Sequence, residues 1–118
     1  MSWLKLYFKL AWFLKTPLIL LLDTRYKPIG YGLIRTLCKA IGLTWDKDFS
    51  DCDDFAWLFK AKAIRRGLNG VGLVVGRMGG KPHCWNVALV EYSLYQVEPQ
   101  TGMTFKKLSN YRAWFVII

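Results

Sequence analysis

A cysteine and the only histidine of the chain carry the clearest chemical signal in this sequence. Cys52 lies where Ser50 and Asp53 have the spacing of a capping box, which begins a helix. The first turn of a helix has unpaired backbone N–H groups and the positive end of the dipole, so it stabilises an anion such as a thiolate. His83 follows on a predicted strand and can serve as the base that a nucleophilic thiol needs.

A third residue follows from a predicted hairpin. Residues 85–90 and 94–97 have the composition of two strands, and the short polar stretch 91–93 joins them. A hairpin brings its outer ends together, so Glu98 at the end of the second strand should lie near His83 at the start of the first. A carboxylate bonded to one imidazole nitrogen leaves the other nitrogen facing the thiol. Cys52, His83 and Glu98 therefore form a candidate catalytic triad.

Three aspartates beside the cysteine oppose this chemistry. The charges of Asp51, Asp53 and Asp54 raise a thiol pKa unless these residues cap the helix, point away or pair with Lys and Arg. The structural alternative is that the aspartates are caps and that Cys52 is a small buried hydrophobic residue.

A metal site is disfavoured, although Cys52, Asp53, His83 and Cys84 all carry suitable ligand atoms. Neighbouring residues on a strand, such as His83 and Cys84, point to opposite faces, and no Cys-x-x-Cys or His-x-x-x-His pair is present. We expect neither a metal nor a cofactor.

These motifs together resemble the transglutaminase-like branch of the papain-like cysteine enzymes, which includes the bacterial transglutaminase-like cysteine peptidases. The resemblance covers residues 45–118 and rests on Asp-Cys-Asp-Asp-Phe-Ala at 51–56, His-x-Trp at 83–85 and Glu-Pro-Gln-Thr at 98–101. It implies Cys52 as nucleophile, His83 as general base and acid, and Glu98 as the orienting residue, where the family more often has Asp or Asn.

The function that follows is a thiol enzyme, either a cysteine peptidase (a hydrolase) or a transglutaminase-like acyl transferase. It would attack a peptide bond or a glutamine side chain and form a thioester, after which hydrolysis, transamidation and deamidation stay open. The Cys52 backbone N–H and a second donor, Trp45, would hold the oxyanion, and Trp85 would pack beneath the site. The alternative function is a catalytically idle binding module of the same fold, associated with a membrane through residues 1–22.

The elements that must position these residues form one domain, residues 1–118. Helices are predicted at 31–41 and 51–66, and strands at 71–78, 84–90, 94–97 and 113–118. Helices followed by strands indicate an α+β fold. The resemblance implies the papain-like or transglutaminase-like form of it, in which N-terminal helices, with the cysteine at a helix start, pack on a small antiparallel sheet.

Residues 1–22 form an apolar and basic amphipathic segment, with Lys5, Lys9 and Lys15 among bulky apolar residues and Pro17 near its end. The lysines and the proline make it a poor membrane-spanning helix, and it lacks a signal-peptide cleavage pattern. It suits packing on the core or on a partner subunit, or binding to an anionic membrane surface.

The composition limits the remaining classes. Three cysteines cannot all pair within one molecule, which favours a reducing compartment. The net charge of +9 is scattered along the chain, so a solvated basic surface is favoured over a specific nucleic-acid site. We expect a protein or peptide substrate, no specific nucleic acid, and a cytoplasmic or peripheral-membrane location. The small size and the basic, aromatic composition suit a viral or phage-encoded protein.

Overall fold

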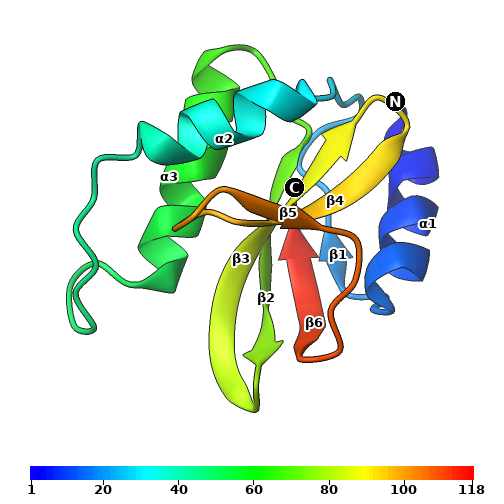
Figure 1. Cartoon of the computed structure of the whole chain (residues 1–118). Helices are drawn as coiled ribbons and strands as arrows, with labels where there is room; N and C mark the ends of the chain where they lie inside the picture. Colours follow the sequence, from blue (N-terminus) through cyan, green and yellow to red (C-terminus); the bar gives the residue numbers. More distant parts are fainter.

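A mixed sheet of six strands lies between helices on both of its faces (Figure 1). The computed structural model describes all residues from 1 to 118. The helices are α1 (Trp3–Leu14), α2 (Tyr31–Lys39) and α3 (Cys52–Arg65). The strands are β1 (Ile19–Leu20), β2 (Val71–Met78), β3 (Lys81–Val90), β4 (Ser93–Glu98), β5 (Met103–Phe105) and β6 (Tyr111–Ile117).

The strand order in the sheet is β1-β6-β2-β3-β4-β5. The pairs β2–β3, β3–β4, β4–β5 and β2–β6 are antiparallel, and only β1 and β6 run parallel. Gly79 and Gly80 join β2 to β3 with φ angles of 58° and 82°, a left-handed conformation that glycine adopts without strain.

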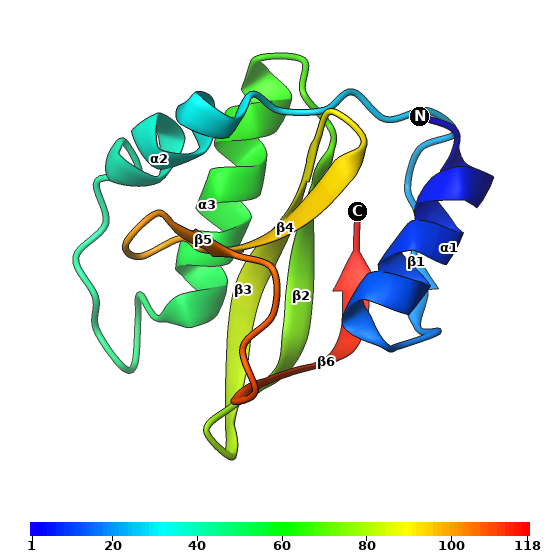
Figure 2. The ribbon, with the colours of Figure 1, turned by 45° about the vertical axis from the view of Figure 1, so that its right-hand side comes forward.

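Two hydrophobic layers form because side chains alternate between the faces of each strand. On one face, Leu6, Leu10 and Leu14 of α1 join a cluster with Val74 and Trp85 of the sheet. On the other face, α2 and α3 pack on the sheet through a second cluster, whose members are Ile29, Ile34, Leu37, Cys38, Phe59, Ala63, Val71, Ala88 and Val97. Figure 2 shows the sheet between α1 and the α2–α3 pair.

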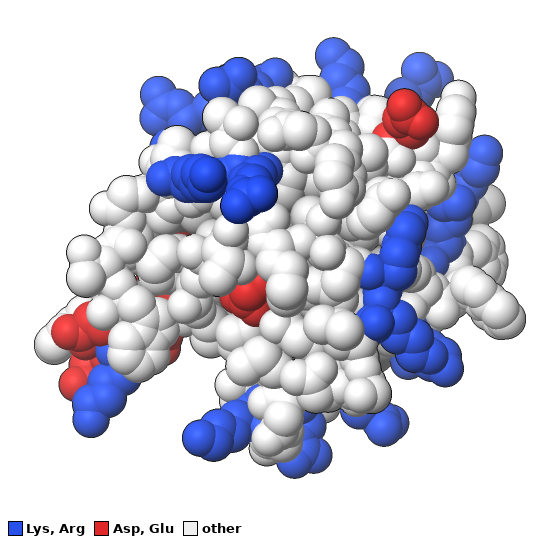
Figure 3. Space-filling model, in the orientation of Figure 1, with Lys and Arg blue, Asp and Glu red and all other residues white.

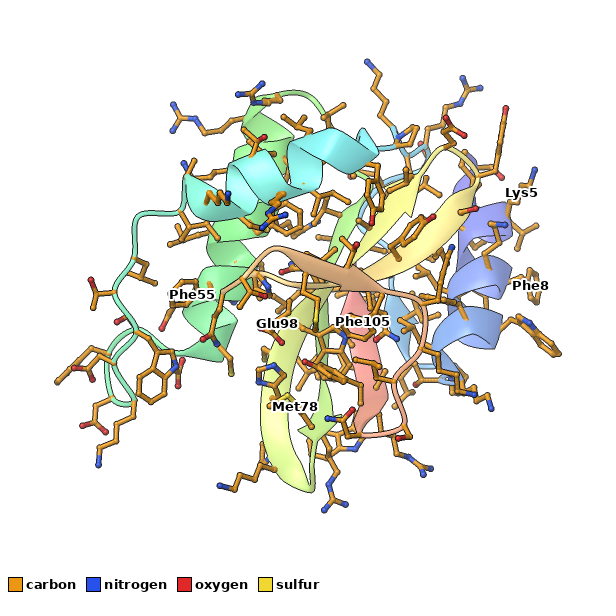
Figure 4. All side chains as sticks on the ribbon, viewed as in Figure 1. Lys5, Phe8, Phe55, Met78, Glu98 and Phe105 are labelled. Atoms are coloured by element: carbon orange, nitrogen blue, oxygen red, sulfur yellow. The ribbon has the colours of Figure 1, made fainter.

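Residues 1–22 are part of this structure. Helix α1 begins after Ser2, whose side chain accepts a hydrogen bond from the Lys5 N–H, and Lys15, with a φ of 55°, is the C-cap after its last residue, Leu14. Its outer surface carries large apolar side chains beside Lys5, because Trp12 is 87% exposed and Phe8 points away from the sheet (Figure 4). No helix in the structure has both the length and the apolar character that crossing a membrane requires.

The architecture corrects the expectation of N-terminal helices packed on a small antiparallel sheet. The sheet is mixed, helices cover both faces, and β1 lies between α1 and α2 in the chain. Strands β1 and β5 have two and three residues, too few for an alternating pattern to indicate them. Strand β3 begins at Lys81, so His83 lies inside the strand and not at its start.

Candidate functional site

Helix α3 begins at Cys52, which places the thiol in its first turn. Asp51 is the N-cap and forms a capping box with Asp54, whose Oδ2 accepts a hydrogen bond from the Asp51 N–H at 3.1 Å. The predicted box of Ser50 and Asp53 is therefore wrong by one residue. The Ser50 hydroxyl instead donates to the Thr44 carbonyl and holds the loop before the helix.

Neighbouring strands bring His83 and Glu98 together. His83 Nε2 on β3 lies 2.8 Å from Glu98 Oε2 at the end of β4. The Tyr111 hydroxyl, on β6, donates to the same oxygen at 3.0 Å. The other carboxylate oxygen, Oε1, is buried without a hydrogen-bond partner. Glu98, near the centre of Figure 4, is thus held by two side chains from different strands and only 8% exposed.

Cys52 meets both His83 and Cys84 at the start of α3. The Cys84 backbone N–H donates to Cys52 Sγ at 3.4 Å, and the Cys84 thiol and the His83 ring lie near enough to lower the pKa of Cys52. Because His83 Nε2 faces Glu98, Nδ1 is the ring nitrogen left for the sulfur. The three predicted residues therefore lie in one row, Cys52–His83–Glu98.

The electrostatics of this row favour an ion pair. Hydrogen bonds from Cys84 and His83, together with the His83 charge, outweigh burial and lower the pKa of Cys52 to about 4. Burial lowers the pKa of His83, but the hydrogen bonds and charges of Cys52 and Glu98 outweigh it and raise that pKa to about 9. Between these values, the site holds a thiolate and an imidazolium.

The nearby aspartates do not prevent this, although five of the eight acidic residues lie between positions 46 and 54. Figure 3 shows acidic residues gathered over the loop between α2 and α3 on a surface with scattered basic residues. Asp51 and Asp54 are engaged in the capping box. A hydrogen bond with Asp51, burial and the nearby charges raise the pKa of Asp53 to about 6, so this carboxyl becomes neutral only as the pH falls through that value. Ligand atoms of Asp51, Cys52 and Asp53 lie within 4.8 Å of one another, close enough to share a cation.

Two tryptophans have predicted supporting roles at this site. Trp85 is fully buried and stacks on His83, with ring centroids 5.8 Å apart and an interplanar angle of 18°. Its Nε1–H donates to Gln96 Oε1 at 2.8 Å, which fixes the ring beneath the histidine. Trp45 is 54% exposed in the loop before α3, and its role as an oxyanion donor stays a prediction.

The sequence did not reveal two residues of the site. No sequence signal links Tyr111 to Glu98, because the pairing of β6 with the rest of the sheet is not local. The alternation of side chains along a strand predicts that Cys84 points to the face opposite His83. Strand β4 pairs with β3 only from Asn86 onward, so one side of β3 is open near His83 and Cys84, and both can reach the start of α3 there.

Comparisons with known proteins find that solved structures of a lectin are similar in fold to this chain. No protein-family model matches the chain, and no curated protein matches its sequence. A solved structure of the lectin of Polyporus squamosus, bound to the epitope Neu5Acα2-6Galβ1-4GlcNAc, matches with a TM-score of 0.84 and 21% identity. A structure of a PSL1a–E64 complex matches with a TM-score of 0.83 and 24% identity. Both alignments cover 100% of this chain but 49% and 51% of those chains, so this chain spans about half their length.

These matches correct several predictions. The solved structures that share the fold are those of a lectin, so the assignment to the transglutaminase-like or papain-like families and to their fold is wrong. The prediction of a thiol enzyme that attacks amides, as a hydrolase or acyl transferase, is corrected on the same ground. The predicted protein or peptide substrate and the membrane surface at residues 1–22 are also corrected, because the lectin binds a carbohydrate. At these identities, the likeness establishes the fold alone.

Proposed function

We propose that this chain is a ligand-binding domain whose site contains a nucleophilic thiolate, Cys52. The observation that carries the proposal is the position of His83 between the Glu98 carboxylate, at 2.8 Å, and the Cys52 sulfur. Such a row keeps the imidazole protonated and the thiol ionised. The site is thereby suited to a ligand with an electrophilic carbon, which the sulfur can bond.

The chemistry at this site needs only the groups described. The Cys52 thiolate attacks the electrophilic carbon, an S–C bond forms, and the bond from carbon to its leaving atom breaks. Where the leaving atom is oxygen, the His83 imidazolium can protonate it, and Glu98 stabilises the cation before the transfer. His83 is positioned for this by stacking on Trp85 and by its hydrogen bond to Glu98.

Selective alkylation tests the proposal. Iodoacetamide at about pH 6, between the pKa values of Cys52 and His83, should modify Cys52 far faster than Cys38 or Cys84. Cys38 is the internal control, because it is 6% exposed and burial raises its pKa to about 12. Mass spectrometry of the digested chain reads each cysteine separately, and equal rates for the three would refute the proposal.

A second probe tests the ligand class. PSL1a was solved in a complex with E64, and the same compound should add to Cys52 of this chain. The Cys52→Ser variant should remain unmodified, whereas Cys38→Ser should react like the original chain. The assignment as a binding domain would be contradicted if the chain turned over a peptide or glutamine amide and Cys52→Ser abolished that activity.

A separate pocket supports a second candidate function, the binding of an acidic sugar. A cavity of about 240 Å³ between the end of α1 and β6 is lined by Lys15, Lys107 and Arg112, with Phe13 and Tyr111 beside them and no acidic residue. Contact with Lys15 lowers the pKa of Lys107, so two cations share this space without a counter-ion. Cations beside aromatic rings can hold the carboxylate and the apolar face of a sialylated sugar.

Calorimetry with two sugars tests this candidate. Neu5Acα2-6Galβ1-4GlcNAc, the epitope bound by the Polyporus squamosus lectin, should bind, and the same sugar without the sialic acid should bind more weakly. Lys107→Ala should weaken binding, while Lys39→Ala on α2 removes the same charge away from the pocket and should not. Equal affinity for both sugars would exclude an acidic-sugar site.

A further inference from the structure

Cys84 is the cysteine closest to the reactive thiol, and the proposed function gives it no role. Its backbone N–H lies 3.4 Å from Cys52 Sγ. An N–Cα bond is about 1.46 Å, so Cys84 Cα lies within about 4.9 Å of the Cys52 sulfur. A disulfide requires Cα atoms about 4.4 to 6.8 Å apart, and this contact places the two cysteines near that range.

The two cysteines also have the accessibility and chemical difference that a redox pair needs. Both are free and partly exposed, unlike the buried Cys38. Cys52 carries the thiolate, and contact with that thiolate, together with burial, raises the pKa of Cys84. A thiolate beside a neutral thiol is the arrangement in which one sulfur is oxidised first and the other resolves the product.

We propose that Cys84 is the resolving cysteine of a reversible disulfide with Cys52, formed when a peroxide oxidises the site. This inference rests on the nucleophilic Cys52 of the proposed function and adds a modification that switches it off.

The two steps balance with hydrogen peroxide as the oxidant. The Cys52 thiolate attacks one peroxide oxygen, the O–O bond breaks, and hydroxide leaves, which gives Cys52 sulfenic acid. The Cys84 sulfur then attacks the sulfenic sulfur, the S–O bond breaks, and the sulfenic oxygen leaves as water with the Cys84 proton. Each disulfide consumes one peroxide, and two electrons pass from the cysteine pair to it. A dithiol reductant reverses the product by thiol exchange.

The disulfide should protect Cys52 from irreversible oxidation. Without a resolving thiol, excess peroxide carries a sulfenic acid on to sulfinic acid, which a dithiol does not reduce. The comparison of the original chain with Cys84→Ser therefore separates resolution by Cys84 from simple oxidation of Cys52. Cys38→Ser is the matched control, because Cys38 is a residue of α2 that belongs to the core cluster.

The test uses the full chain, excess hydrogen peroxide, and alkylation of Cys52 before treatment, after treatment and after dithiothreitol. Lysines and arginines between residues 60 and 81 let trypsin separate the two cysteines, so the non-reduced digest should contain a linked Cys52–Cys84 peptide pair. The original chain and Cys38→Ser should lose Cys52 alkylation and regain most of it after reduction. Cys84→Ser should regain several-fold less.

Two results would overturn the inference: absence of the linked peptide pair, or equal recovery in the original chain and Cys84→Ser. If Cys84→Ser does not fold, the linked pair in the original chain decides alone. Failure of the proposed function is distinguishable, since it would appear before peroxide is added, as slow alkylation of Cys52 in the reduced chain.

Discussion

Replacing Glu98 with glutamine tests the electrostatics of the site most directly. Glu98 Oε2 lies 2.8 Å from His83 Nε2 and accepts a second hydrogen bond from Tyr111. Glutamine retains the length of the side chain and a carbonyl oxygen but removes the negative charge. The pKa of His83, raised to about 9 in the original chain, should therefore fall, and the pKa of Cys52 should rise above about 4.

The size of the expected shift in the His83 pKa follows from its hydrogen bond to Glu98. A hydrogen bond to a charged group contributes about 1.5 to 3 kcal/mol. One pKa unit corresponds to about 1.4 kcal/mol, so the loss is worth about 1 to 2 units. Solvent screens this pair little, because the side chains of His83 and Glu98 are 9% and 11% exposed. The pKa of His83 in the variant should lie about 1 to 2 units below that of the original chain.

Proton NMR gives the answer without ambiguity, because His83 is the only histidine in the chain. Its ring resonances follow a single titration curve, whose midpoint is the pKa. Glu91→Gln is the matched control, since Glu91 lies in the exposed turn between β3 and β4 and its loss changes the net charge equally. A midpoint that is unchanged in Glu98→Gln, or that moves equally in Glu91→Gln, would refute the role of Glu98.

Three further substitutions test other parts of the structure. Asp51→Ala removes the N-cap of α3 and should lower the free energy of unfolding by about 0.5 to 2 kcal/mol in urea titrations, whereas Ser50→Ala should cost less; the reverse order would restore Ser50 as the cap. Leu10→Ala leaves a cavity between α1 and the sheet and should cost about 2 to 5 kcal/mol in the same titrations; a near-neutral result would mean that α1 does not stabilise the domain. Tyr111→Phe removes the second hydrogen bond to Glu98, worth about 1.5 to 3 kcal/mol because the acceptor is charged, and should shift the His83 titration midpoint less than Glu98→Gln does, because the carboxylate charge remains; a larger shift would assign Tyr111 the dominant role.

The local parts of the site could be predicted from the sequence. The helix that begins at Cys52 follows from the polar residues before an apolar run, although the cap is Asp51 and not Ser50. The nearness of His83 and Glu98 follows from a hairpin with a two-residue turn, so it depends on strand pairing within 16 residues. Such relations are encoded by short-range patterns, and a single sequence displays them.

Other features were decided by tertiary structure. The pairing of β6 with β2 brings Tyr111 to Glu98, and the parallel pair of β1 and β6 joins residues almost 100 positions apart. The sheet end beside α3 lets His83 and Cys84 both reach Cys52, against the simple alternation of a strand. No local pattern specifies such long-range pairings.

The predicted family also shows that a single sequence does not specify the fold around a motif. A cysteine, a histidine and an acid in this order predicted a row of side chains. The same residues also predicted a papain-like enzyme, which the lectin structures that share this fold contradict. Residue types in a motif specify which groups can react with each other, and the same groups recur on different folds. The sequence by itself thus predicted that Cys52, His83 and Glu98 are neighbours. Only the three-dimensional arrangement of the sheet and helices decided what surrounds them, because that arrangement depends on contacts between segments far apart in the chain.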